Sequence, residues 1–290
     1  MSQPSVGTAE KKRRLAWLRP PKGAPDGTMS LMDHLKELRY RVTVAFAAIV
    51  AMAVVAAFFY EPIIAVILRP FYQAGELIQA ANPDAQLQIV TDGVISPFTL
   101  AIIACAVGGV IMATPVWMYQ IWAFIAPGLM RTEKKYATMF LAAAVPLFLT
   151  GCFVGYWILP KGIAVMLGFT PSGMDITNLL ELSRFLNFEL RIIAIFGVSF
   201  LLPVIIVAMN LMGVVKGYQL GKARKIVIFL TFVFAAAATP SIDPFSMLAL
   251  SVPMTLLYLL AELICRQLDK RKGITAETVA EWQIDVADGE

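Results

Sequence analysis

The sequence predicts an all-α, polytopic membrane protein with six transmembrane helices and both termini on the cytoplasmic side. Apolar residues make up 59% of its 290 residues and charged residues only 15%, against roughly 45–50% and 25% in soluble domains. Long uncharged runs recur along the chain, and Lys and Arg gather in alternate connecting segments. The composition excludes a soluble domain, whose surface needs polar cover, and a disordered chain, which lacks apolar residues.

Six uncharged runs are the candidate spans: residues 42–60, 98–125, 137–159, 192–212, 226–238 and 247–261. The first four are near or above the roughly 20 residues that cross a bilayer as a helix. The last two hold only 13 and 15 residues, which predicts short fifth and sixth helices that would thin the bilayer beside them. Strands are excluded, because a lone strand in lipid leaves its backbone unpaired.

The distribution of basic residues predicts the orientation. Twenty of the 24 Lys and Arg residues lie in the two tails and in the loops at 127–136 and 213–225. Basic loops stay on the cytoplasmic side, so both termini should lie there. The two external segments, 61–97 and 160–191, are too long to be simple turns, and we expect them to form partly helical caps.

The residues just before the first span predict an amphipathic helix. An apolar stripe runs from Leu31 to Val42 with charged residues around it, as in an amphipathic helix at a membrane interface. Glu37 and Arg41 are spaced to form an ion pair on this helix. The expected division is a disordered basic tail, a single six-span membrane domain and a cytoplasmic C-terminal tail (1–29, 30–265 and 266–290).

The chain lacks the motifs of an enzyme. It has no Gly-rich phosphate loop, no nucleophile elbow and no HExxH sequence, and its three Cys have no zinc or disulfide spacing. We therefore expect no catalytic residue, no metal and no cofactor. The basic residues follow topology, which speaks against nucleic acid as a partner. The single histidine, His34, is interpreted as a solvated or headgroup-facing side chain.

Two acids on the cytoplasmic side stand in basic surroundings, Glu37 and Glu133. One interpretation is local ion pairing on a hydrated surface, which contributes under about 1 kcal/mol. The other is a pair of receptors for the guanidinium groups of a basic ligand, since carboxylates grip the planar arginine fork well. The residues alone leave both interpretations open.

Several blocks carry a family resemblance: His34–Arg39, Ser96–Phe98, Pro115 with Tyr119–Leu129 and Glu133, Phe196–Phe200 with Pro203, and Thr239–Pro240 with Asp243, Phe245–Ser246 and Pro253. Together they resemble the TatC family, the multispanning receptor of the twin-arginine protein translocase. The resemblance covers the chain from about Leu31 to Cys265.

The resemblance implies a function in the cytoplasmic membrane of a bacterium. TatC-like proteins bind the paired arginines of signal peptides on folded cargo. They then organise single-span TatA- and TatB-type subunits for export driven by the protonmotive force. It also implies self-association in a multi-subunit complex and contact with membrane lipid.

The resemblance also assigns residues. It implies that Glu37 and Glu133 face the arginines of the signal peptide, with Arg39 and Phe124 near the same site. Structural or partner-docking positions are Pro70, Asp92, Pro115, Pro240 and Asp243. Two positions depart from the pattern, since Leu201 and Met247 replace polar side chains that many members carry.

The alternative is a six-span secondary transporter or channel. That class needs ionisable residues at mid-membrane that face a cavity. The sequence offers Glu262 at the inner end of the last span and Asp243 at the hairpin turn. Neither position suits a transport path, so the receptor function is favoured.

Overall fold

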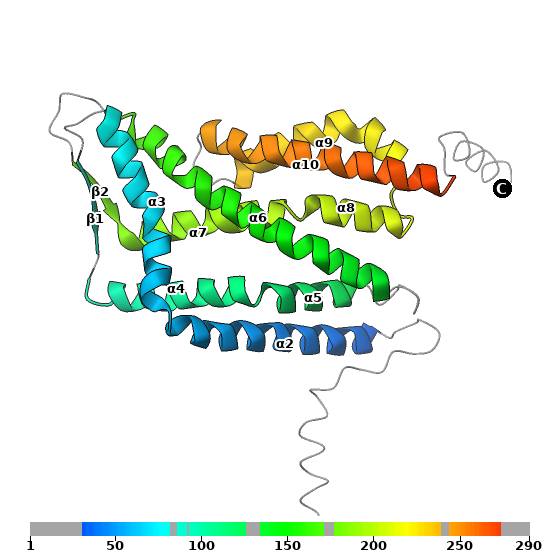
Figure 1. Ribbon diagram of the computed structural model, residues 1–290, viewed down its shortest axis with the longest axis horizontal. Helices are drawn as coiled ribbons and strands as arrows, with labels where there is room; N and C mark the ends of the chain where they lie inside the picture. The colour runs from blue at the N-terminus through cyan, green and yellow to red at the C-terminus, as the bar shows by residue number, and fades with distance from the viewer. Residues whose placement is uncertain are drawn as a thin grey trace, which may run out of the picture. The chain divides into compact units, whose positions relative to one another are not determined.

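The computed structural model describes residues 31–81, 86–91, 93–125, 134–170, 177–238 and 244–273, most of them helical (Figure 1). The elements are α2 (Leu31–Ala57), α3 (Tyr60–Ala81), β1 (Gln86–Val90), α4 (Ser96–Met112), α5 (Thr114–Ile125), α6 (Lys134–Leu167), β2 (Thr177–Glu181), α7 (Leu182–Ser199), α8 (Leu202–Leu211), α9 (Gly217–Ala238) and α10 (Pro244–Arg271). They form two compact units, Met1–Ile63 with Ala101–Val145 and Ile64–Leu100 with Pro146–Glu290.

Within these residues, four helices are long and apolar enough to cross a membrane: Met32–Ala57, Phe140–Leu167, Leu182–Leu211 and Pro244–Arg271. The pair α4–α5 makes a fifth if it counts as one span. A multi-pass helical membrane protein is therefore confirmed. The count of six spans and the placement of both termini stay predictions, because α9 does not meet the same criteria.

In the first unit, α2 packs against α4 and α5 through small residues. A Cβ on Gly109 would lie 2.7 Å from the backbone N of Ala53 and 2.7 Å from the carbonyl of Ile49. A Cβ on the neighbouring Gly108 would lie 2.9 Å from the Cβ of Ala56, which is fully buried. Small side chains at such positions let helix backbones approach closely in membranes. The glycine pair therefore sets the distance between α2 and α4.

The run 98–125, predicted as one span, is bent by 60° between α4 and α5. Pro115 lies in the first turn of α5 and has no backbone N–H to continue the ladder of α4. The hydroxyl of Thr114 and the indole Nε1 of Trp117 both donate to the carbonyl of Val110, at 3.1 and 3.0 Å. Side chains thus satisfy the backbone where the proline interrupts it.

The second unit contains a small parallel sheet that the sequence does not predict. β1 pairs with β2 in the register Gln86↔Thr177 to Val90↔Glu181. The expectation that the segment 61–97 is partly helical is confirmed by α3, but the all-α assignment is wrong for these two strands. Their partners lie far apart in the sequence, and parallel pairing of distant segments leaves no local signal.

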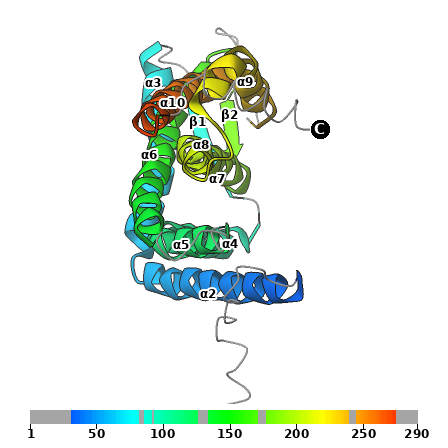
Figure 2. The ribbon, with the colours of Figure 1, turned by 90° about the vertical axis from the view of Figure 1, so that its right-hand side faces the viewer.

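The prediction of short fifth and sixth helices is wrong. The two helices are α9, with 22 residues, and α10, with 28. They lie side by side, with α8 along α10 (Figures 1 and 2). At about 1.5 Å per residue, α9 is roughly 33 Å long, although only its part from Ile226 onward is uncharged. Both helices continue past their apolar runs because charged side chains beyond the runs pair across the interface.

Candidate functional site

Glu37, on the second turn of α2, is buried rather than placed on a hydrated surface. Its exposed fraction is 5%. Arg41 donates from Nε to Glu37 Oε1 at 2.8 Å and bonds the same oxygen through Nη2. The predicted ion pair is confirmed. The ion pair occupies Oε1 of the Glu37 carboxylate and leaves Oε2 without a bond from Arg41.

The second carboxylate oxygen, Glu37 Oε2, is buried and has no hydrogen-bond partner among the described residues. A buried oxygen without a donor is unfavourable by about 1–3 kcal/mol, and by more when it carries charge. Arg41 also reaches α5, where its Nη1 lies 3.5 Å from Gln120 Oε1, a long contact. The carboxylate is therefore held in place on one side and available to a donor on the other.

A pair of stacked rings lies on the side of α2 that carries this acid. The imidazole of His34 stacks on Phe124 with 4.5 Å between ring centres and 16° between planes. Since His34 and Glu37 are three residues apart on α2, they share a face. His34 is half-buried, so the expectation of a solvated or headgroup-facing side chain stays a prediction, to which the structure adds a ring contact from α5. Trp122, 5% exposed, stacks in turn on Phe140 at 3.9 Å.

The structure brings Phe124 close to the Glu37 site but not Arg39. The Arg39 side chain is exposed, and a residue two positions from Glu37 on a helix points elsewhere. Glu133 lies outside the described residues, as do Asp92, Pro240 and Asp243. Pro70 is fully buried within α3, and Pro115 lies at the α4–α5 bend.

Three further acids among the described residues are buried in the second unit: Glu189, Glu262 and Asp269. Glu262 is 2% exposed and ion-paired with Arg224 and Arg266. Glu189 on α7 is 1% exposed, and neither of its oxygens has a hydrogen-bond partner within the part of the chain described. No sequence motif marks Glu189, which lies just before the apolar run 192–212. No group of three metal-ligating side chains occurs among the residues that the structure describes.

Comparison with known proteins gives consistent matches. The family model for the Sec-independent protein translocase protein TatC matches residues 33–253. A TatC protein of Frankia casuarinae is 37% identical over 87% of this chain and 70% of its own length. One from Rickettsia prowazekii is 30% identical over 86% of this chain and 97% of its own.

Solved structures agree with the sequence matches. Two crystal structures of the twin arginine translocase receptor TatC, one of them in the detergent DDM, superimpose with TM-scores of 0.63 and 0.64. They are 27% and 28% identical to this chain and cover 81% and 80% of it. The match includes 98% and 99% of their own chains. The similarity therefore extends over nearly the whole length of those two chains.

Proposed function

Because this chain belongs to the TatC family of Sec-independent protein translocase proteins, we propose that it binds the twin-arginine signal peptides of folded cargo at its cytoplasmic face. The family is a translocase component and not a family of catalytic enzymes. The apolar helices make the chain a multi-pass membrane protein. The observation that carries the proposal is the buried carboxylate of Glu37 with its one free oxygen.

The geometry limits how an arginine can bind to Glu37. Arg41 already donates two hydrogen bonds to Oε1. While Arg41 stays there, an incoming arginine cannot bind both carboxylate oxygens at once. An incoming guanidinium would donate to Oε2 and use its other donors on a second acid, for which we propose Glu133. Arginine suits this division because its fork presents several donors in one plane, whereas lysine offers a point charge.

The neighbouring rings suit the same ligand. Guanidinium groups stack on aromatic faces, and Phe124 lies on the face of α2 that carries His34 and Glu37. We assign Phe124 to the binding surface. Arg39 belongs to the proposed site as an outer residue that meets the peptide beside its arginines.

Partner subunits and topology complete the proposal. The chain self-associates and organises single-span TatA- and TatB-type subunits for export driven by the protonmotive force, with Pro70, Asp92, Pro115, Pro240 and Asp243 as structural or docking positions. It lies in the bacterial cytoplasmic membrane with six spans and both termini inside. Cysteines introduced near residues 84 and 175 should react with impermeant reagents from outside only; labelling from the cytoplasm would overturn this topology.

The direct test uses the full-length chain in detergent and a fluorescent signal peptide with two arginines. A peptide with two lysines should bind at least about tenfold more weakly, since hydrogen bonds to charged groups contribute about 1.5–3 kcal/mol each. Equal affinity for both peptides would reduce the site to a general cation site.

The transporter or channel alternative draws on Glu189, a buried acid in an apolar helix. Ion flux through vesicles containing this chain alone would favour it.

A further inference from the structure

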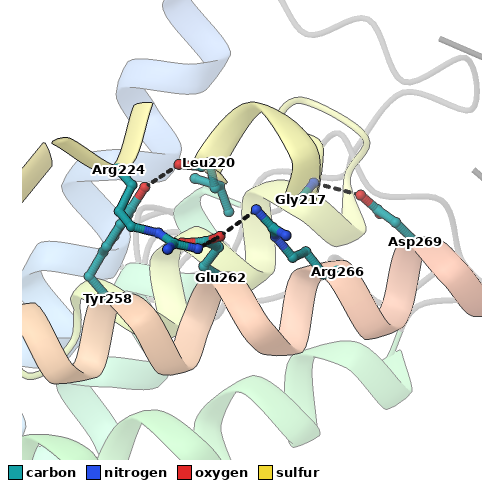
Figure 3. A network of polar contacts seen from close by, with 7 residues as sticks. All are labelled: Gly217, Leu220, Arg224, Tyr258, Glu262, Arg266 and Asp269. Atoms are coloured by element: carbon teal, nitrogen blue, oxygen red, sulfur yellow. Dashed lines mark hydrogen bonds and ion pairs between the residues drawn. The ribbon is translucent and has the colours of Figure 1, made fainter. Parts of the chain in front are cut away.

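A network of polar contacts joins the charged ends of α9 and α10 (Figure 3). Glu262 of α10 accepts from Arg224 of α9 at both oxygens, at 3.0 and 2.7 Å. Arg266, one turn further along α10, pairs with the same carboxylate at 2.7 Å. Glu262 is 2% exposed. The two guanidinium groups therefore converge on one buried acid and are held in fixed positions by it.

Supporting contacts hold the two helices around this network. Asp269 accepts from the backbone N–H of Gly217 at 2.6 Å, and Tyr258 donates to the carbonyl of Leu220 at 2.8 Å (Figure 3). Asp269 also accepts from Asn210 at 2.8 Å. These contacts fix α9 against α10 on both sides of Glu262. The arginine positions are thus a consequence of the helix packing and not of free side-chain motion.

The cluster of Arg224, Glu262 and Arg266 carries a net positive charge, and its two arginines face outward. Two arginines share one carboxylate, and their side chains remain 47% and 50% exposed. A guanidinium has five N–H donors, and Glu262 uses only some of them. No other acceptor for Arg224 or Arg266 occurs in the described ranges. The outer donors are free for an anion, and arginine forks bind the oxygens of phosphate groups well.

The network also lies at the level where the helices change from apolar to charged. On α9 the apolar run begins at Ile226, directly after Lys225, and on α10 it ends at Ala261, directly before Glu262. Apolar side chains next to this boundary are exposed, including Ile226 at 64% and Leu263 at 53%. Basic side chains above an apolar, lipid-facing surface lie at the depth of phospholipid headgroups.

We infer that Arg224 and Arg266, held by Glu262, form a binding site for the phosphate of an anionic phospholipid. The fixed guanidinium pair supplies the headgroup contacts, and the exposed apolar residues beside it supply the surface for acyl chains. Gly221 is part of this site, because a Cβ there would overlap the guanidinium of Arg266. The inference is independent of signal-peptide binding, which concerns the first unit.

The test measures phosphatidylglycerol bound to the full-length chain by native mass spectrometry, with phosphatidylcholine as the neutral reference. Arg266→Gln removes one fork and leaves the two hydrogen bonds between Arg224 and Glu262. We expect it to lower phosphatidylglycerol binding about tenfold. The matched control is Lys272→Gln, the same change of charge in the turn just after α10, about 9 Å from Arg266 at the helical rise. There, screening over a distance near the Debye length should keep the loss under about twofold.

A second variant guards against a simple folding defect. Gly221→Ala keeps every charge but displaces the Arg266 guanidinium, so it should also lose phosphatidylglycerol preference while melting normally in phosphatidylcholine. Equal losses in Arg266→Gln and Lys272→Gln would mean diffuse attraction between charges and would overturn the site. Full retention by Gly221→Ala would overturn it too. Displacement of the lipid by millimolar inorganic phosphate would make it a site for a free anion instead.

Discussion

The ion pair between Glu37 and Arg41 leads to the prediction that removing Arg41 strengthens peptide binding. If Arg41 occupies one oxygen of the acid that binds the signal peptide, it is an internal competitor for the ligand. Arg41→Met removes the guanidinium and keeps the aliphatic stem. Both oxygens of Glu37 then become available, and an incoming arginine can form a two-pronged contact. We expect the affinity for a twin-arginine peptide to rise about tenfold, from one added hydrogen bond to a charged group.

The same substitution should weaken the fold. The side chains of Arg41 and Glu37 are 19% and 7% exposed, and removing one partner of a buried pair leaves an uncompensated charge. That loss is about 3–5 kcal/mol for a fully buried pair, and we expect the lower end here because Arg41 is partly exposed. Glu37→Gln should instead lower peptide affinity at least tenfold. Opposite effects on binding from the two halves of one ion pair would separate competition from simple stabilisation.

Fluorescence anisotropy with the purified chain gives the affinities, and the denaturation midpoint gives the stability. Lys36→Met is the matched control, because Lys36 is 59% exposed and pairs only locally with Asp33; it should change affinity less than about twofold. Weaker peptide binding by a folded Arg41→Met variant would refute the reasoning. Arg41 would then position Glu37 for the ligand rather than compete with it.

Three further predictions concern binding and stability. Gly109→Ala should destabilise the protein by about 1–3 kcal/mol through overlap with the α2 backbone, whereas Gly75→Ala, with 3.8 Å to its nearest neighbour, should be neutral or stabilising in thermal denaturation. Glu189→Leu should leave the denaturation midpoint equal or higher, because it removes a carboxylate without a hydrogen-bond partner among the described residues. Glu262→Leu should lower the stability by about 3 kcal/mol, because it breaks an ion pair with Arg224. Equal losses of stability in the two variants would contradict this contrast. Arg39→Ala should weaken peptide binding less than Glu37→Gln, and a larger loss would move the site to the exposed face of α2.

The apolar runs predict where most long helices lie but not where they end. The run that begins at Ile226 lies inside α9, which begins nine residues earlier at Gly217. The extension depends on contacts such as that between Arg224 and Glu262, which are 38 residues apart. Local hydropathy carries no information on such a pairing. The same limit explains why the parallel pair β1–β2 is absent from the sequence prediction.

The candidate site was predictable only where its contacts are local. The pair Glu37–Arg41 follows from helix spacing alone, and the structure confirms it. Gln120 lies 79 residues from Arg41, and nothing in its surroundings marks it as a partner. The stack of His34 on Phe124 is equally long-range, which is why the sequence suggests a solvated histidine. The bend at Pro115 was visible as a proline, but not as a break of 60°.

The three buried glutamates among the described residues differ in how many guanidinium groups meet them. Glu262 has two, Glu37 has one, and Glu189 has none among the described residues. Two arginines neutralise the charge of a buried carboxylate, and one positive charge of the pair remains. This remaining charge attracts an anion. With one arginine, a buried carboxylate is half satisfied, and it can accept one more cationic donor. Burial alone would class these acids together, whereas their partners separate a ligand-binding acid from a structural one.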